Sequence, residues 1–312
     1  MARMNALLAL ILVAVVNNHE NSLALVDAQK HAVAAVVPVG NGPHEVVFTA
    51  DGRNAIVSNY GTKDAPGHSL SIIDTATMKE ITRASVAPLS RPHGLAVSGR
   101  RVWFTAEGSL AIGRYDIDAG VVDQVVGTSQ RVSHMIAADL AHQKLYAANI
   151  FSNSISSIQP ANGPGGWDVE QIGVANGPEA IDVTPDGTRV WTGHRPAGGI
   201  SVIDTATKKV IANVPVSTFV FRIRFTPDGR YALATEPEAH QLLVFNATSR
   251  ELVKKVPIEG APVTVAIDAS GQRAYVASAG PNKIYVVDLE TLNVVDEMPS
   301  GGVPDQIAVT ER

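Results

Sequence analysis

The phrase Ser-Val-Ile-Asp-Thr-Ala-Thr at residues 201–207 recurs almost unchanged as Ser-Ile-Ile-Asp-Thr-Ala-Thr at residues 71–77. Weaker copies occur along the rest of the chain, and the position of the Asp supplies seven anchors: Asp27, Asp74, Asp116, Gln159, Asp204, Asn246 and Asp288. Successive anchors lie 42 to 47 residues apart. A repeat of about 40–45 residues built from four short strands is typical of a β-propeller blade. The sequence therefore predicts an all-β, seven-bladed propeller.

Each repeat contains the signals of four short strands. β-Branched residues alternate with small ones, and turns such as Pro-Asp-Gly at residues 185–187 and 227–229 separate the runs. The first strands of the repeats should begin near residues 43, 92, 133, 178, 220, 262 and 304. The anchor Asp recurs with the repeat, so we expect its role to be structural.

The two ends of the chain complement each other. The last predicted strand, Pro304 to Thr310, has no partner after it, and the first repeat lacks a first strand. We therefore expect Pro304–Thr310 to pair with Leu10–Val16, which would close the ring and remove both free sheet edges. Residues 1–312 would then form a single domain.

The apolar run Leu7–Val16 has a second interpretation. With Arg3 before it, the run resembles the start of a signal peptide, although no clean cleavage site follows. It is too short to span a membrane, which takes about 20 apolar residues. We favour the strand, because cleavage would leave one sheet a strand short. A strand here predicts a cytoplasmic protein.

Composition narrows the range of functions. The chain has a net charge of −5, 45% hydrophobic residues and no cysteine. The hydrophobic content excludes disorder, and the absence of cysteine excludes disulfides, thiolate catalysis and Cys-ligated zinc. A mildly acidic chain without a basic run argues against nucleic-acid binding. We expect a monomer that acts on a small molecule.

Two family resemblances are present. The Ser-Val-Ile-Asp-Thr-Ala-Thr phrase, with Pro-Asp-Gly-Arg at residues 227–230, resembles the YVTN family of bacterial β-propellers over essentially the whole chain, although the naming tetrapeptide is absent. The repeat with Arg-Pro-His-Gly-Leu-Ala-Val at residues 91–97 is similar to the blades of streptogramin lyases. The first resemblance implies a periplasmic or secreted propeller. The second implies a catalytic His with an assisting magnesium ion, and His44 and His93 match its Pro-His motif.

The residue after the Pro position opens the innermost strand of each blade, so seven such residues should ring one mouth of the central channel. In blade order they are His44, His93, His134, Glu179, Phe221, Val263 and Asp305. The last neighbours the first across the closure. The ring therefore has a continuous polar arc, from Asp305 to Glu179, and an apolar arc made by Phe221 and Val263.

Three histidines and two carboxylates on one axis suggest a site for a divalent metal ion. Imidazole ligands suit Zn, Mn or Fe better than Ca or Mg. We expect His44, His93, His134 and Glu179 to be the ligands. Glu179, Asp305 or His93 would act as the acid or base in catalysis.

The apolar arc and the surrounding loops would form the substrate pocket. Phe221 and Val263 would receive the apolar part of the substrate, and Arg222 could bind an anionic part. The loops on the same face carry further polar candidates for this pocket: Asn18, His19, Asn59, Asn149, His194 and Glu236. Loops at one end of a rigid scaffold are the usual place for function.

Four functions fit this pattern. A metal-dependent hydrolase acting on lactones, esters or phosphotriesters is the one that we favour, because a metal ion can polarise an oxygen and activate water. A lyase of the streptogramin type and a non-catalytic binding propeller are the alternatives. Metal-dependent oxidation is also open, although the ring lacks a fourth histidine.

Overall fold

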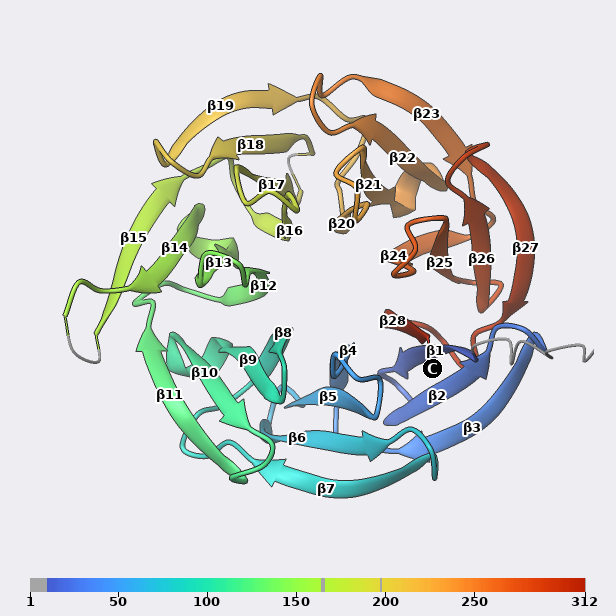
Figure 1. The fold of residues 1–312 in the computed structure, drawn as a ribbon, viewed down its shortest axis with the longest axis horizontal. Coiled ribbons are helices and arrows are strands. Elements are labelled where there is room, and N and C mark those ends of the chain that lie inside the picture. Colours follow the sequence, from blue (N-terminus) through green and yellow to red (C-terminus); the bar gives the residue numbers. More distant parts are fainter. Residues whose placement is uncertain (1–9, 164–165, 197, 312) are drawn as a thin grey trace, which may run out of the picture.

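The computed structural model describes residues 10–163, 166–196 and 198–311. Within this part of the chain, the strands form seven four-stranded antiparallel sheets arranged in a closed ring (Figure 1). The predicted all-β propeller with seven blades is therefore confirmed. The blades follow one another around the ring in chain order (Figure 1).

The strands occupy four positions in each blade. The innermost strands are β28 (Gln306–Glu311), β4 (Pro43–Phe48), β8 (Pro92–Ser98), β12 (Ser133–Asp139), β16 (Pro178–Val183), β20 (Arg222–Phe225) and β24 (Ala261–Ile267). The second strands are β1 (Ile11–Asn17), β5 (Asn54–Gly61), β9 (Arg101–Ala106), β13 (Lys144–Asn149), β17 (Arg189–His194), β21 (Tyr231–Glu236) and β25 (Arg273–Ala279).

Third strands and outer strands complete the sheets. The third strands are β2 (Ser22–Asp27), β6 (Pro66–Asp74), β10 (Ala111–Asp116), β14 (Ser154–Pro160), β18 (Ile200–Asp204), β22 (Gln241–Asn246) and β26 (Lys283–Asp288). The outer strands are β3 (Ala32–Pro38), β7 (Lys79–Ser85), β11 (Val121–Gly127), β15 (Trp167–Gly173), β19 (Lys209–Val214), β23 (Leu252–Pro257) and β27 (Asn293–Pro299). Short 3-10 turns follow three of the second strands: η1 (Glu107–Ser109), η2 (Ile150–Ser152) and η3 (Pro237–Ala239).

The last strand closes the ring as the sequence predicted. β28 pairs with β1 in an antiparallel register that runs from Ile11 opposite Glu311 to Val16 opposite Gln306. The closing strand begins at Gln306, two residues later than predicted. Of the apolar run Leu7–Val16, residues 7–9 lie outside the described residues.

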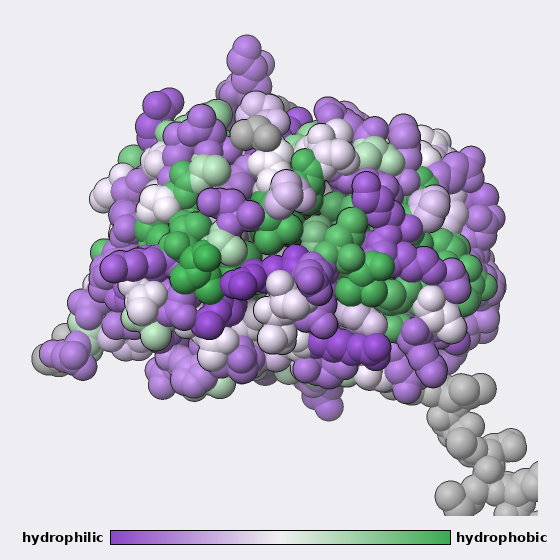
Figure 2. All heavy atoms as spheres, turned by 90° about the horizontal axis from the view of Figure 1, so that it is seen from above, coloured by the Kyte–Doolittle hydropathy of each residue, from purple (hydrophilic) through white to green (hydrophobic). Residues whose placement is uncertain are grey.

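Apolar side chains between neighbouring blades hold the ring together. At the closure, Val13 and Val26 of the first blade pack in one buried cluster with Tyr275 and Ile284 of the last. Burying a large apolar side chain is worth about 1.5–3 kcal/mol, so each such interface stabilises the closed ring. The outer surface is more mixed. Figure 2 shows one side of the ring, where apolar patches alternate with hydrophilic ones.

The repeated Asp closes the turn between the third and fourth strands. In blade five, Oδ1 of Asp204 accepts hydrogen bonds from the backbone N–H (2.8 Å) and the hydroxyl (2.9 Å) of Thr207. Asp74 makes the same two bonds to Thr77, at 2.7 and 2.8 Å. Turn geometry therefore explains why the phrase recurs. Among the described residues, no helix is long and apolar enough to cross a membrane.

Candidate functional site

The predicted ring of residues surrounds a cavity of about 160 Å³ at one mouth of the channel. Its lining residues are His44, Glu45, His93, His134, Met135, Glu179, Arg195, Phe221, Arg222 and Asp305. The structure thus brings together six of the seven residues expected at the mouth. Val263 is the exception, since it does not line this cavity.

A shared irregularity of the innermost strands aims these side chains into the channel. In β4 the pairing with the second strand shifts between Pro43 and Val46, and the same shift occurs in β8, β12 and β16. The site residue follows the first paired residue of each strand. A β-bulge re-aims the side chain that it carries, so the same local irregularity directs four of the five residues of the polar arc, His44, His93, His134 and Glu179.

The three histidines stack in series across neighbouring blades. The ring centroids of His44 and His93 lie 4.8 Å apart, and those of His93 and His134 lie 3.9 Å apart. The ring of Tyr60 meets His44 and His93 edge-on, at 5.1 and 5.6 Å. His93 is therefore enclosed by aromatic rings, and only 6% of its surface is exposed.

Each outer histidine is paired with a carboxylate through its Nδ1 atom. Nδ1 of His134 lies 2.5 Å from Oε1 of Glu107, and Nδ1 of His44 lies 2.9 Å from Oδ2 of Asp305. An ionised carboxylate only accepts hydrogen bonds, so Nδ1 of His134 is the donor to Glu107. The contact of His44 with Asp305 is a close ion pair rather than a well-aligned hydrogen bond. Nε2 of His134 is then left to bind a ligand, whereas Nε2 of His44 lies 3.3 Å from Nδ2 of Asn18. A carboxylate at Nδ1 is the arrangement that commonly orients metal-binding histidines.

The central histidine has an unused polar atom. Nδ1 of His93 is buried and has no hydrogen-bond partner among the described residues. One potential ligand atom from each of His93, Glu107 and His134 lies within 4.8 Å of the others. These three residues could hold a metal ion together.

Burial and neighbouring charges shift the acidities at this mouth. Burial holds the pKa of His93 well below its usual value, and the neighbouring His134, His44 and Arg222 lower it further. Burial opposes protonation of His44 as well, but the close contact with Asp305 and the charges of nearby carboxylates outweigh it and raise the pKa of His44. Burial and the hydrogen bond to Glu107 raise the pKa of Tyr60 to about 12. The cluster therefore combines a neutral central imidazole with a more basic outer one.

A buried ion pair forms the floor of the cavity and crosses the channel. Nη2 of Arg222 donates to Oε1 of Glu45 at 2.7 Å, and the other oxygen of Glu45 accepts from Nε2 of Gln306 at 2.6 Å. Arg222 comes from blade six, Glu45 from blade two and Gln306 from blade one. Because its charge is already paired with Glu45, Arg222 is mainly a structural part of the cavity.

The rim opposite the histidines carries an ion pair and aromatic rings. Nη1 of Arg195 lies 3.3 Å from Oε1 of Glu179. The guanidinium of Arg195 also lies over the rings of Phe219 and Phe221, at 5.0 and 5.9 Å from their centroids. Glu179 therefore lines the cavity as expected, but its described partner is Arg195 rather than a histidine.

Most of the predicted loop candidates for the substrate pocket lie outside the cavity. Asn18 reaches the rim, where Nδ2 lies 3.3 Å from Nε2 of His44, and His19 is exposed on the adjacent turn. The other four are buried away from the cavity lining: Asn59, Asn149, His194 and Glu236.

The four buried candidates bond within or between strands. Asn59 and Asn149 donate to serine hydroxyls of the next strand, Ser71 and Ser156, at 3.0 Å each. His194 occupies the same position in its blade, with Nε2 lying 2.8 Å from the hydroxyl of Ser201. Oε1 of Glu236 accepts from the Ser217 hydroxyl at 2.7 Å. These side chains lie at or near the ends of second strands, which are one layer behind the channel wall.

Sequence reasoning missed the roles of Glu107 and Glu45. Glu107 follows β9 on a loop of the correct face, but the ring was built from first strands alone. Glu45 directly follows His44, and the bulge between Pro43 and Val46 lets both side chains line the cavity. The signal for Glu107 is its place directly after a second strand, and the signal for Glu45 is its place next to a ring histidine.

No family model and no curated protein matches the chain. The resemblances to the YVTN family and to streptogramin lyases are therefore not confirmed. Solved structures match over nearly the whole length. A putative 6-phosphogluconolactonase from Bacteroides uniformis has a TM-score of 0.77 at 15% identity, covering 97% of this chain and 99% of that one.

Two further solved structures have similar TM-scores. Kuenenia stuttgartiensis hydrazine synthase has a TM-score of 0.72 at 19% identity over 86% of this chain and 89% of its own. A functionally unknown protein from Desulfotomaculum acetoxidans has a TM-score of 0.76 at 13% identity over 96% and 98%. At such identities the likeness extends to the fold alone. The chain is thus a seven-bladed β-propeller, and its chemistry has to be inferred from the site at the channel mouth.

Proposed function

We propose that the histidine mouth binds a divalent transition-metal ion and catalyses hydrolysis of a small ester or lactone. One observation carries this proposal: two Nδ1–carboxylate pairs flank a buried histidine whose Nδ1 has no described partner. A histidine with a purely structural role does not need carboxylate-paired histidines on both sides of it. His93 could offer its unpaired Nδ1 to a divalent ion, with His134 held in orientation beside it by Glu107.

His93 and His134 are the proposed nitrogen ligands. Glu107 either completes the ligand set or holds the His134 ring through Nδ1, and Tyr60 keeps Glu107 in place with a hydroxyl donor at 2.6 Å. A divalent ion at this point would polarise a carbonyl oxygen and lower the pKa of a water molecule. Imidazole ligands make Zn, Mn or Fe the expected metals.

His44 and Asp305 are the proposed base. Nε2 of His44 would accept a proton from water in place of its 3.3 Å contact with the Asn18 amide, and Asp305, 2.9 Å from Nδ1, would stabilise the resulting imidazolium. Phe221 forms the apolar wall beside this group. A cavity of about 160 Å³ encloses only the reacting part of a substrate, so the rest would extend past Arg195 into solvent.

Elemental analysis and activity assays test the proposal together. The purified protein should contain about one equivalent of transition metal. It should hydrolyse at least one member of a panel of lactones, aryl esters and phosphotriesters. Chelation should remove the activity, and added Zn or Mn should restore it. His93→Ala should lose both metal and turnover, because it removes a ligand at the channel wall rather than a residue of the inter-blade core.

A matched control uses a histidine away from the mouth. His142 lies on an exposed turn and bonds Asp139, so His142→Ala should keep metal and activity. Elimination products would assign the lyase chemistry instead. Activity that survives chelation would remove the metal from the mechanism. No metal and no turnover would leave a binding propeller as the function.

A further inference from the structure

The opposite mouth of the channel contains a second and larger cavity, of about 500 Å³. Its walls come from the far ends of the innermost strands and are largely apolar, with Val47, Val97, Ala266, Ile307 and Ala308 among them. Nothing in the proposed hydrolase uses this cavity. The buried pair of Arg222 and Glu45 lies between the two mouths.

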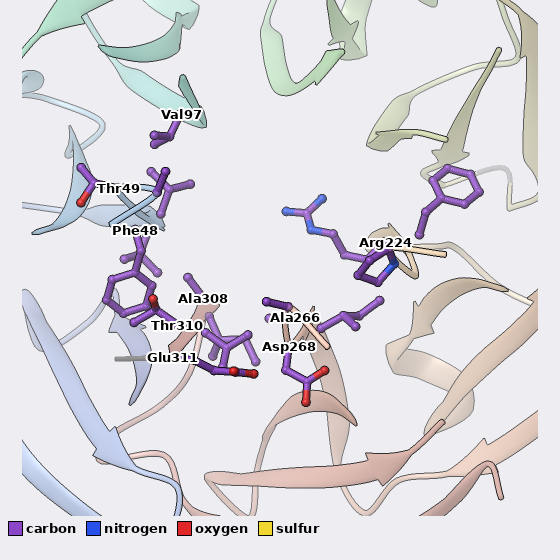
Figure 3. A pocket seen from close by; sticks show the side chains of 18 residues that line it. Phe48, Thr49, Val97, Arg224, Ala266, Asp268, Ala308, Thr310 and Glu311 are labelled. Carbon is purple, nitrogen blue, oxygen red and sulfur yellow. The ribbon is translucent and has the colours of Figure 1, made fainter. Parts of the chain in front are cut away.

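Arg224 is the cationic residue that lines this cavity. Strand β20 alternates, so Arg222 and Arg224 both face the channel while Ile223 and Phe225 are buried in the blade. Figure 3 shows the Arg224 side chain extending away from its own strand into the opening. Arg222 therefore lines the histidine mouth and Arg224 lines the opposite mouth, although both belong to β20.

The guanidinium of Arg224 has donors to spare. Its only hydrogen bond among the described residues runs from Nη1 to the carbonyl oxygen of Ile223, at 3.1 Å. An arginine carries five N–H donors in a planar fork that matches a carboxylate. Burial lowers the pKa of Arg224, so bulk water does not fully solvate the charge. A desolvated cation with free donors favours an anionic partner.

The nearby carboxylates do not fill that role. Asp182 attracts Arg224, but Oδ2 of Asp182 accepts from the backbone N–H of Phe225 (2.9 Å) and Oδ1 from that of Val183 (3.0 Å). Asp268 accepts the backbone N–H of Gln272 at 2.9 Å within its own turn. Among the described residues, neither forms an ion pair with Arg224.

We propose that this mouth binds a small monocarboxylate with an apolar body, its carboxylate held by Arg224 and its body against the apolar walls. The volume lies within the range of 300–1,000 Å³ of ordinary small-molecule sites. Arg224 is the one cationic side chain among the described residues that line the cavity, and it matches one negative charge. The carboxylates of Asp268 and Glu311, which also line the cavity, disfavour multiply charged ligands such as phosphates.

Binding of 4-phenylbutyrate to the full chain tests this site, with 4-phenylbutyramide as the uncharged probe of the same shape. Ligand-observed NMR titration gives both dissociation constants. The carboxylate should bind at least tenfold more tightly than the amide. Arg224→Gln should remove that preference, because it removes the charge and the fork of donors. Equal binding of the two probes to the parent protein would overturn the proposal.

Two further variants separate this site from the rest of the molecule. Ala308→Phe should weaken binding at least tenfold by filling the cavity with Arg224 intact. Arg53→Gln changes an exposed arginine of the same face and should leave binding unchanged. Melting temperatures establish that each variant is folded. Binding that depends on Arg195 instead of Arg224 would place the probe at the histidine mouth and refute this site, whatever the outcome for hydrolysis.

Discussion

Glu107 and His134 belong to neighbouring blades, and the carboxylate of one lies 2.5 Å from Nδ1 of the other. Asp305 and His44 repeat the relationship, at 2.9 Å across the closure of the ring. In both pairs the carboxylate comes from the preceding blade. The orientation of each histidine therefore depends on how adjacent blades pack, and so does the proposed metal affinity.

Glu107→Gln should weaken metal binding by about 10- to 100-fold, since that is the usual cost of losing the carboxylate partner of a ligating histidine. A competition titration with a chromogenic zinc chelator measures it. Glu107→Asp should recover part of the affinity. Glu236→Gln is the control, because Glu236 ends the second strand of another blade and bonds Ser217 away from the cavity. Equal affinity of Glu107→Gln and the parent would contradict the assigned role.

Arg222→Met should lower the free energy of unfolding by about 3–5 kcal/mol, because it leaves the buried Glu45 carboxylate without its cation. The double variant Arg222→Met with Glu45→Leu should recover a large part of that loss, since no buried charge is left unpaired. Urea denaturation of the parent, both single variants and the double variant gives the coupling. Additive losses would show that the pair is not coupled.

Deleting the last nine residues, 304–312, should cause aggregation or a large drop in melting temperature. The deletion removes β28, exposes the edge of β1 and takes Ile307 out of the core between the first and last blades. Ile307→Val is the control and should cost only about 0.5–1.5 kcal/mol. A truncated protein that melts like the full chain would disprove the closure.

The burial of His194 predicts that the protein loses stability in mild acid. Burial lowers its pKa from 6.5 to about 4. Because the folded state holds the neutral ring, the contribution to stability is complete above pH 6.5 and is lost as the pH falls through 4. At about 1.4 kcal/mol per unit of pKa, the loss is on the order of 3 kcal/mol.

His194→Asn isolates that effect. Asparagine occupies the same place in other blades, where Asn59 and Asn149 bond serine hydroxyls as His194 does. The variant should melt near the parent at pH 7.5 and fall less between pH 6.5 and 4. Thermal melts at half-unit pH intervals measure the difference. Parallel curves for the two proteins would assign the acid sensitivity to other groups.

The repeat makes the fold predictable from the sequence alone. Each blade encodes its own strands and turns locally, since Asp204 binds Thr207 three residues later and a short run of alternating residues is enough for a strand. Counting such units gave the number of blades, the closing strand and the register of the channel-facing residues. For the same reason His44, His93, His134 and Glu179 were expected at one mouth, where the structure has them.

The contacts between blades could not be predicted from the repeat. The sequence by itself determined which residues open the innermost strands, because that depends on neighbours a few positions away. Only the tertiary structure decided that Glu107 binds His134, that Arg222 crosses the channel to Glu45 and that Arg224 faces an apolar cavity. Glu107 and His134 lie 27 positions apart in the sequence, and Glu45 and Arg222 lie 177 positions apart. The distance between the side chains of each pair depends on the angle at which whole sheets pack. No local pattern encodes that angle, because it results from the sum of many apolar contacts around a closed ring.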